Sequence, residues 1–329
     1  MRAKGLFLAA VMVALFVACG GEDNETPAVA KGIWVNDLLG GAVWKFTFDG
    51  RTLVHNDSLI GGGSGGIAVN RTTGCCWVAC PSVGEVVKLS PAGERIFTVN
   101  LPSASGGVNA IAVEESDGSV RCANSGMFWV LKLNDAGEEL WRVDVFVPED
   151  LSVYETDGAC WVAHFFDHTN NAGLTKLDKD GNVLFTRDPG GDAGSYGVAV
   201  DQRNGDCWVV GTDGKLYKYT AAGDVKFEVS TGLYIRDLAI FPGDGSVVLL
   251  TSDTVANLSY LTKFDANGND LWTAGVSYDA SYVAVNPNDN TIWVSHDEKG
   301  LVKYSPTGQE LLTVKPTDSF YPDRLSVHY

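Results

Sequence analysis

The sequence predicts an all-β protein, a seven-bladed β-propeller with four-stranded blades. Three observations carry this prediction: a lysine-centred marker that occurs seven times, a short apolar trio that also occurs seven times, and an incomplete last unit. A regular period of this length, with four strand-like segments in each unit, is typical of propeller blades. The period therefore decides the fold before any local pattern is considered.

The composition agrees with a β-rich protein. The chain has 329 residues with 38 Gly and nine Trp, a content that favours strands and turns over helices. Its formal net charge of -17 argues against a nucleic-acid partner, because phosphate binding needs clustered Lys and Arg that displace condensed counterions. The length allows two domains or one large β domain.

The N-terminus carries an export signal. Arg2 and Lys4 precede an apolar run from Leu6 to Ala18, which has signal-peptide length and is too short to span a bilayer. The residues before Cys19 resemble a bacterial lipobox, although Phe16 stands where a small residue is more usual, and an ordinary secretory signal is the alternative. We expect residues 1–18 to be a lipoprotein signal peptide and Cys19 to become the lipidated first residue.

This signal also predicts where in the cell the protein is located. The lipid on Cys19 would hold the protein at the membrane of a bacterial cell envelope, facing the periplasm or the surface, with the outer membrane favoured. Residues 19–31 are small and acidic and predict a flexible tether. Residues 32–329 remain for the propeller, at about 43 per blade, which leaves no second domain.

The first marker is a Lys followed by Leu, Phe or Tyr and, five residues after the Lys, by Gly. The seven lysines are Lys45, Lys88, Lys132, Lys176, Lys218, Lys263 and Lys303. The Gly fits a hairpin that requires positive φ. The lysines should form a ring on one face, each stem covering the neighbouring blade while its amine reaches water.

The second marker is the apolar trio with Ala or Ser at its centre, which ends at Val69, Val113, Val153, Val200, Ile240, Val285 and Val327. Eight residues later come Trp77, Trp161, Trp208 and Trp293, whereas two units have Arg121 and Val248 there. In the first unit these markers predict strands at Ile67 to Val69, Cys76 to Ala79, Val86 to Leu89 and Arg95 to Val99.

The last unit supplies one strand, Leu325 to Tyr329, and then the chain ends. Its missing partners are predicted at Ile33 to Asn36, Val43 to Phe46 and Thr52 to His55, because Trp34 lies 43 residues before Trp77. The last blade should therefore consist of the C-terminal strand and three N-terminal strands, which removes two exposed sheet edges.

Units such as GIAVNRTTGCCWVA (residues 66–79) and GVAVDQRNGDCWVV (197–210) resemble NHL repeats, and the Trp on the second strand is similar to the virginiamycin B lyase group of propellers. The resemblance covers nearly all of the mature chain. It implies a propeller and leaves several functions open, since such folds include ligand binders, protein-interaction modules, lyases and hydrolases. The seven blades differ from the six that are common among NHL propellers.

Ligands of propellers generally bind at a channel mouth, and the repeat register identifies the residues there. They are expected three positions after the Trp site and four before the end of each trio. The polar candidates are His164, His296, Glu149, Arg236, Asn109, Tyr196 and Asp323. His164 and His296 fall in blades nearly across the ring, too far apart to share a metal ion. We therefore expect neither a metal nor a cofactor.

The cysteines offer little chemistry. Cys76, Cys160 and Cys207 each precede a blade Trp and should pack as small hydrophobes. Cys75, Cys80 and Cys122 are the candidates for disulfides, and their pairing stays open. Most thiols are expected to be buried and unbridged.

The functional prediction is a lipid-anchored binding module that presents its channel mouth to a small molecule or a protein and catalyses no reaction. The alternative is a lyase or hydrolase whose mouth contains His164, Glu149, Arg236 and His296, residues that could perform acid and base chemistry.

Overall fold

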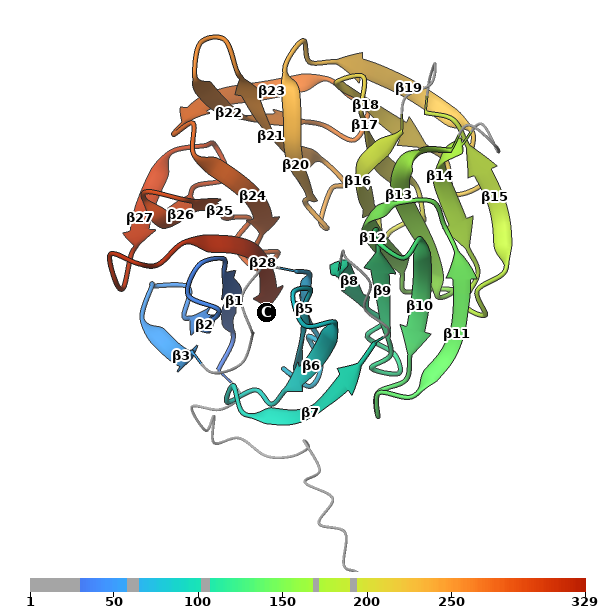
Figure 1. Ribbon diagram of the computed structural model, residues 1–329. Helices are drawn as coiled ribbons and strands as arrows, with labels where there is room; N and C mark the ends of the chain where they lie inside the picture. The colour runs from blue at the N-terminus through green and yellow to red at the C-terminus, as the bar shows by residue number, and fades with distance from the viewer. Residues whose placement is uncertain (1–29, 58–64, 102–106, 168–171, 190–193) are drawn as a thin grey trace, which may run out of the picture.

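The structure is a computed structural model that describes residues 30–57, 65–101, 107–167, 172–189 and 194–329. Within them, the strands form seven four-stranded antiparallel sheets, arranged as blades around a ring (Figure 1). The predicted fold and blade count are confirmed. The signal peptide, Cys19 and nearly all of the predicted tether lie outside the described residues.

The blades are numbered along the chain from Ile67. Blade 1 contains β4 (Ile67–Val69), β5 (Cys76–Cys80), β6 (Glu85–Leu89) and β7 (Arg95–Asn100). Blade 2 contains β8 (Val108–Val113), β9 (Val120–Asn124), β10 (Trp129–Leu133) and β11 (Glu139–Asp144). Blade 3 contains β12 (Pro148–Tyr154), β13 (Ala159–Asp167), β14 (Ala172–Leu177) and β15 (Val183–Arg187). Blade 4 contains β16 (Ser195–Val200), β17 (Cys207–Gly211), β18 (Lys215–Tyr219) and β19 (Val225–Ser230).

The remaining blades include the closing one. Blade 5 contains β20 (Tyr234–Ile240), β21 (Val247–Asp253), β22 (Leu258–Phe264) and β23 (Asp270–Val276). Blade 6 contains β24 (Ala280–Val285), β25 (Ile292–His296), β26 (Gly300–Tyr304) and β27 (Glu310–Val314). Blade 7 contains β28 (Pro322–His328), β1 (Gly32–Asp37), β2 (Val43–Phe46) and β3 (Thr52–Asn56), paired in that order.

Blade 7 closes the ring as predicted. The C-terminal strand β28 pairs with β1, with Ile33 opposite Val327 and Val35 opposite Leu325. The strand begins at Pro322, three residues earlier than predicted, because the ladder continues through an irregularity to a pair between Asp37 and Pro322. Both chain ends are thereby used to complete one sheet, which leaves neither edge of β1 unpaired.

The repeated glycines form the hairpins between the third and fourth strands. Their φ angles are 86° at Gly50, 82° at Gly93, 84° at Gly137, 86° at Gly181, 88° at Gly223, 84° at Gly268 and 81° at Gly308. At Gly93 an added Cβ would also lie 2.2 Å from Cγ1 of Val54 in blade 7. Gly is required there both by backbone conformation and by the close approach of the neighbouring blade.

The tryptophans of the second strands fill the interfaces between blades. Trp208 is fully buried and packs with Val247, Leu249 and Phe264 of blade 5. Fully buried side chains at the equivalent position are Trp34, Trp77, Trp161 and Trp293. The prediction that this column lies between neighbouring sheets is confirmed.

The prediction for the lysine ring is partly wrong. Five of the seven side chains, Lys45, Lys88, Lys132, Lys176 and Lys218, are buried instead of reaching water. For Lys45, Lys88 and Lys176 the reason is a better partner for the amine, the hairpin carbonyl of the next blade, whereas Lys132 bonds to Glu114 and Lys218 lies 4.0 Å from Asp201. Nζ donates from Lys45 to Pro91 at 3.2 Å, from Lys88 to Asp135 at 2.8 Å, from Lys176 to Ala221 at 2.8 Å and from Lys303 to Phe48 at 3.1 Å.

These lysines also lie over the buried aromatic rings. The amine of Lys218 is 4.4 Å from the ring centroid of Trp208, and that of Lys45 is 4.9 Å from the ring centroid of Trp34. Burial lowers the pKa of Lys45 to about 8. For Lys45 the contact with the aromatic face and the carbonyl bond together offset the cost of burying the amine, and for Lys218 the aromatic face and the nearby carboxylate of Asp201 do so.

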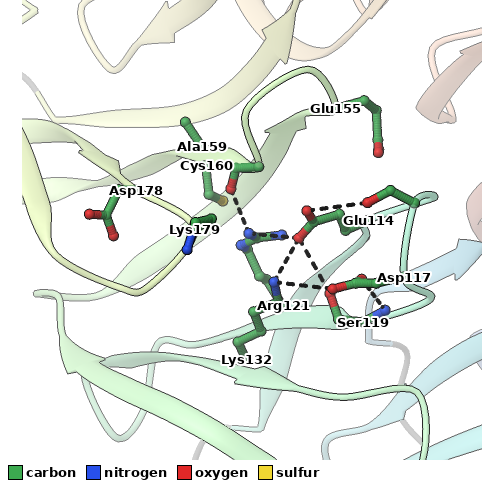
Figure 2. A network of polar contacts seen from close by, with 12 residues as sticks. Glu114, Asp117, Ser119, Arg121, Lys132, Glu155, Ala159, Cys160, Asp178 and Lys179 are labelled. Carbon is green, nitrogen blue, oxygen red and sulfur yellow. Dashed lines mark hydrogen bonds and ion pairs between the residues drawn. The ribbon is translucent and has the colours of Figure 1, made fainter.

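Blade 2 replaces the Trp by an ion cluster, shown in Figure 2. Arg121 is fully buried, and its Nη2 donates to the carbonyl of Gly158 at 2.6 Å and lies 3.0 Å from Oε2 of Glu114. Lys132 also bonds to Glu114, at 2.7 Å. Trp208 makes the equivalent carbonyl bond, from Nε1 to Gly245 at 3.2 Å. Arg121 thus makes the same kind of bond to the next blade as Trp208 does, and it shares the carboxylate of Glu114 with Lys132.

The six described cysteines are all buried, and no disulfide links them. Burial raises the pKa of the thiols at Cys76, Cys80, Cys122, Cys160 and Cys207, so they are poor nucleophiles. Within the described residues no helix combines the length and hydropathy that a bilayer crossing requires.

Candidate functional site

The predicted rim residues lie at one end of the blades. The first column, at or near the ends of the second strands, comprises Asp37, Cys80, Asn124, His164, Gly211, Thr251 and His296. The second column, at the start of the innermost strands, comprises Gly65, Asn109, Glu149, Tyr196, Arg236, Ser281 and Asp323. Register places the two columns side by side, since Pro148 pairs with His164 and Ala280 with His296.

The two histidines are engaged within their own blades. His164 is buried, with Nδ1 2.9 Å from the Phe165 carbonyl and Nε2 3.0 Å from Thr175 Oγ1. His296 is buried, with Nδ1 3.3 Å from Asp279 Oδ1 and Nε2 3.3 Å from Tyr304 Oη. Burial lowers the pKa of His296. The structure does not bring His164 and His296 together with Glu149 or Arg236 in any contact between described residues.

The other rim candidates mostly tie neighbouring segments together. Tyr196 donates from its hydroxyl to the carbonyl of Ile235 in the next blade. Arg236 donates from Nε to Ser252 Oγ at 2.5 Å and lies 5.3 Å from the ring centroid of Tyr278.

One pair of predicted residues does meet at the mouth. Asn109 hydrogen-bonds to Glu149 across the interface between blades 2 and 3 and also donates to Ser125 at 2.6 Å. Burial raises the pKa of Glu149, while Arg324 and Asn109 oppose the rise. Asp323 lies close enough to Arg324 to interact with its charge. Glu149 and Asp323 thus both lie near the guanidinium of Arg324 at the mouth.

The most distinctive group of charged side chains lies on the innermost strands, one residue after the second column of rim residues. A channel cavity of about 200 Å³ is lined by Asp150, Asp237, Tyr282 and Arg324, together with apolar residues of the inner strands. Blades 1 and 2 contribute the small residues Gly66 and Ala110. The charged lining thus belongs to blades 3, 5 and 7, and the channel is asymmetric although the ring is nearly regular.

Sequence reasoning missed these residues because of a recurring β-bulge. Register shifts occur between Val108 and Ala110, Pro148 and Asp150, Ser195 and Gly197, Ile235 and Asp237, and Ala280 and Val283. A bulge re-aims the side chains beside it, so the position three before the end of the trio lines the cavity. The sequence does contain a signal for these cavity residues. At the position three before the end of each trio, charged residues occur among small ones: Gly66, Ala110, Asp150, Gly197, Asp237, Tyr282 and Arg324.

Each cavity carboxylate is anchored by the backbone of its own and the next blade. Asp150 accepts from Val198 N at 2.9 Å and from Leu151 N at 2.9 Å. Asp237 accepts from Val283 N at 2.7 Å. Burial raises the pKa of Asp150, and it raises the pKa of Asp237 to about 7.

Arg324 has a different environment. Its guanidinium carbon lies 4.8 Å from the ring centroid of Tyr282. Burial opposes its charge, yet Tyr282, Asp150 and Asp237 raise the pKa of Arg324 overall. Neither Asp150 nor Asp237 lies within the 4.0 Å of an ion pair with it. The guanidinium thus lies near both acids without forming an ion pair with either.

The pKa of Asp237 predicts a pH dependence. An unfolded Asp ionises near 3.8 and the folded one near 7, so folding binds a proton between these values and stability falls as pH rises through this window. Replacing Asp237 by Asn should flatten this fall by up to about 1.4 kcal/mol per pH unit. Urea melts at pH 5, 6, 7 and 8 measure the slopes.

Other groups titrate in the same window, so the comparison with wild type is what isolates Asp237. Burial raises the pKa of Glu155 to about 7, with the same sign, and lowers the pKa of His328 to about 4, with the opposite sign. Asp318→Asn, at an exposed position, is the matched control. Parallel slopes for wild type and Asp237→Asn would contradict the assignment.

A larger groove of about 620 Å³ lies between blades 4 and 5. Its lining is dominated by hydroxyl and apolar side chains from outer strands and contains no Lys, Arg or His. Among the described residues, no group of three or more His, Cys, Asp or Glu is placed to hold a metal ion. The channel cavity is therefore the candidate site, despite its smaller volume.

Comparison with known proteins identifies the fold and no more. No family model matches the chain, and no curated protein matches it. Among solved structures, one titled "Streptogramin B lyase structure" has 14% sequence identity and a TM-score of 0.63, over 83% of this chain and 92% of that one. A functionally unknown protein from Desulfotomaculum acetoxidans DSM 771 has 12% identity and a TM-score of 0.69, over 91% of this chain and 98% of that one.

Proposed function

We propose that this chain is a lipid-anchored binding module of the bacterial cell envelope that holds a small polar ligand in its channel. The supporting observation is Arg324, a cation that lines the cavity near two anchored carboxylates and forms an ion pair with neither. Ligand sites are concave and carry a few convergent polar groups that determine orientation. The cavity of about 200 Å³ is small, which favours a small molecule over a protein segment as the ligand in the channel.

Binding without catalysis is favoured by the state of the histidines. The residues expected to perform acid and base chemistry, His164, Glu149, Arg236 and His296, have separate partners, as described above. A catalytic base needs a free lone pair within reach of its substrate, and both histidines use their two nitrogens in contacts inside their blades.

A lyase or hydrolase remains the second candidate, for one specific reason. Asp237 has a pKa of about 7 and faces the cavity near Asp150 and Arg324, and a carboxyl poised near neutrality suits general acid or base catalysis. One structural neighbour is titled a lyase, although a likeness at 14% identity supports only the fold.

Ligand-dependent melting tests the binding proposal. A panel of small organic acids, amines, amino acids, sugars and nucleosides is added to the purified protein, and a ligand at about 100 times its Kd should stabilise the fold by about 2.7 kcal/mol. The stabilisation should disappear in Arg324→Gln and persist in Arg95→Gln, an exposed arginine of β7.

Three outcomes of the panel discriminate. Stabilisation that survives Arg324→Gln, or no stabilisation by any compound, contradicts the proposed site. Consumption of the stabilising compound, followed by NMR of the mixture, would establish the lyase or hydrolase alternative instead.

The lipid anchor is a separate prediction that rests on Cys19. Expression of the full chain in a bacterium should give a mature protein that begins at Cys19, carries acyl chains in its intact mass and partitions with membranes. Cys19→Ser should shift it to the soluble fraction, because one or two acyl chains supply the membrane affinity. A wild-type mature mass without acyl chains would contradict the lipoprotein assignment.

A further inference from the structure

We infer that the ligand of the channel cavity is a small zwitterion of the amino-acid class, with its oxyanion on Arg324 and its ammonium between Asp150 and Asp237. The inference rests on the proposed function, since it names the ligand of the same cavity. It follows from the charges, the anchoring of the side chains and the cavity size, taken in turn below.

Arg324 selects an oxyanion. A guanidinium has five N–H donors in a planar fork, which matches the two oxygens of a carboxylate. Its described contact is with the face of Tyr282, at 4.8 Å from the ring centroid, and this contact orients the plane without using the N–H groups as donors to a protein carboxylate. The donors of Arg324 therefore suit a carboxylate supplied by the ligand.

Asp150 and Asp237 select a cation. Each is oriented by backbone N–H groups, Val198 N to Asp150 at 2.9 Å and Val283 N to Asp237 at 2.7 Å. An ionised carboxylate has about four acceptor positions, so these bonds leave capacity for a donor from the cavity. Burial and the charge of Asp150 both raise the pKa of Asp237, and a cationic group beside the two acids would relieve both effects.

The arrangement of charges favours a ligand that carries both a positive and a negative group over one that carries a single charge. A simple anion would pair with Arg324 but would add negative charge beside Asp150, Asp237, Glu149 and Asp323, which all lie near that arginine. A simple cation would pair with the acids but would be repelled by Arg324. A molecule with one negative and one positive group pairs with Arg324 through the first and with the two acids through the second. It then brings no group next to a protein group of the same charge.

The size of the cavity limits the ligand to a few heavy atoms. Its volume of about 200 Å³ is below the roughly 300 to 1,000 Å³ of sites for drug-sized ligands. The charged residues come from blades 3, 5 and 7, so the two ends of the ligand are recognised on different blades across the channel.

Calorimetry with three zwitterions of increasing charge separation tests the inference: glycine, β-alanine and γ-aminobutyrate. The comparison compounds are acetate, propionate and butyrate as matched acids, and methylamine, ethylamine and propylamine as matched amines. At least one zwitterion should bind tenfold or more tightly than its matched acid and its matched amine.

Variants test the binding of the carboxylate and the binding of the ammonium separately. Arg324→Gln should weaken the best zwitterion at least tenfold, whereas Arg324→Lys, which keeps the charge, should weaken it less. Asp237→Asn should weaken the zwitterion without weakening the matched acid. Arg95→Gln is the control, and circular dichroism melts of each variant show whether it is folded before its affinity is compared.

The outcomes separate this inference from the proposed function. If an acid or an amine binds as tightly as its matched zwitterion, the inference is overturned while small-molecule binding in the channel stands. The inference is also overturned, and small-molecule binding in the channel again stands, if no zwitterion binds but another compound of the melting panel binds and loses its affinity in Arg324→Gln. If nothing in either set binds, both are overturned.

Discussion

Deleting Leu325 to Tyr329 is expected to destabilise the propeller by on the order of 5 kcal/mol and to make it aggregate. The deletion removes most of β28, including the pairs Val327 with Ile33 and Leu325 with Val35. It also removes Ser326, whose Oγ accepts from Val69 N at 3.0 Å and joins blade 7 to blade 1. Such a loss is a large part of the total stability of a typical protein.

The reason for the large effect is the position of the strand in the ring. β28 is the innermost strand of blade 7, and without it β1 becomes an open edge that faces the channel. Unpaired strand edges are templates for intermolecular pairing. Urea melts measure the stability, and light scattering at increasing protein concentration measures the association.

Deletion of Gly20 to Ala30 is the matched control, since these residues precede the first strand and their removal is expected to leave the melt unchanged. Trimming the frayed end of a chain generally has a near-zero effect on the free energy of unfolding. A truncation of Leu325 to Tyr329 that melts like the parent would therefore contradict ring closure by the C-terminal strand.

Replacing Trp208 by Ala is expected to cost about 3 to 5 kcal/mol, the range for truncating a large buried aromatic. The ring packs between blades 4 and 5 against Val247, Leu249 and Phe264, and it meets Phe227 edge-on at 5.6 Å between centroids. The substitution also removes the bond from Nε1 to the Gly245 carbonyl and the aromatic face under Lys218.

Two further variants serve as comparisons for Trp208→Ala. Leu311→Ala, at a side chain that is 53% exposed on β27, should change the urea midpoint very little. Trp208→Phe should cost less than Trp208→Ala, because most of the apolar contact is kept. A change below about 0.5 kcal/mol for Trp208→Ala would be surface-like behaviour and would contradict the packing of this column.

Both predictions were already available from the repeat in the sequence, and the structure confirms the strand arrangement on which they depend. The spacing between Trp34 and Trp77 equals one period, which is enough to pair the two ends of the chain. This works because each blade buries the same column against its neighbour, so the same constraint acts seven times on the sequence. A repeated constraint survives substitutions in single copies, such as Arg121 and Val248.

The environment of the lysine ring needed the tertiary structure. The sequence predicts that the stems of Lys45 and Lys88 cover the neighbouring blade while their amines reach water. Their actual partners are carbonyls of Pro91 and Asp135 in the next blade, which lie about one period away in the chain. Only the close packing of blades, with Gly93 against Val54, brings those carbonyls within reach.

The sequence by itself determined the fold class, the blade count, the closure of the ring and the column of buried tryptophans, because periodic burial leaves a periodic pattern. The tertiary structure alone decided which residues face the channel. A bulge at the start of the innermost strands shifts the alternation of side chains by one position, so Asp150, Asp237 and Arg324 line the cavity in place of the residues before them. A bulge is set by pairing with the neighbouring strand, and the spacing of the repeat does not record it.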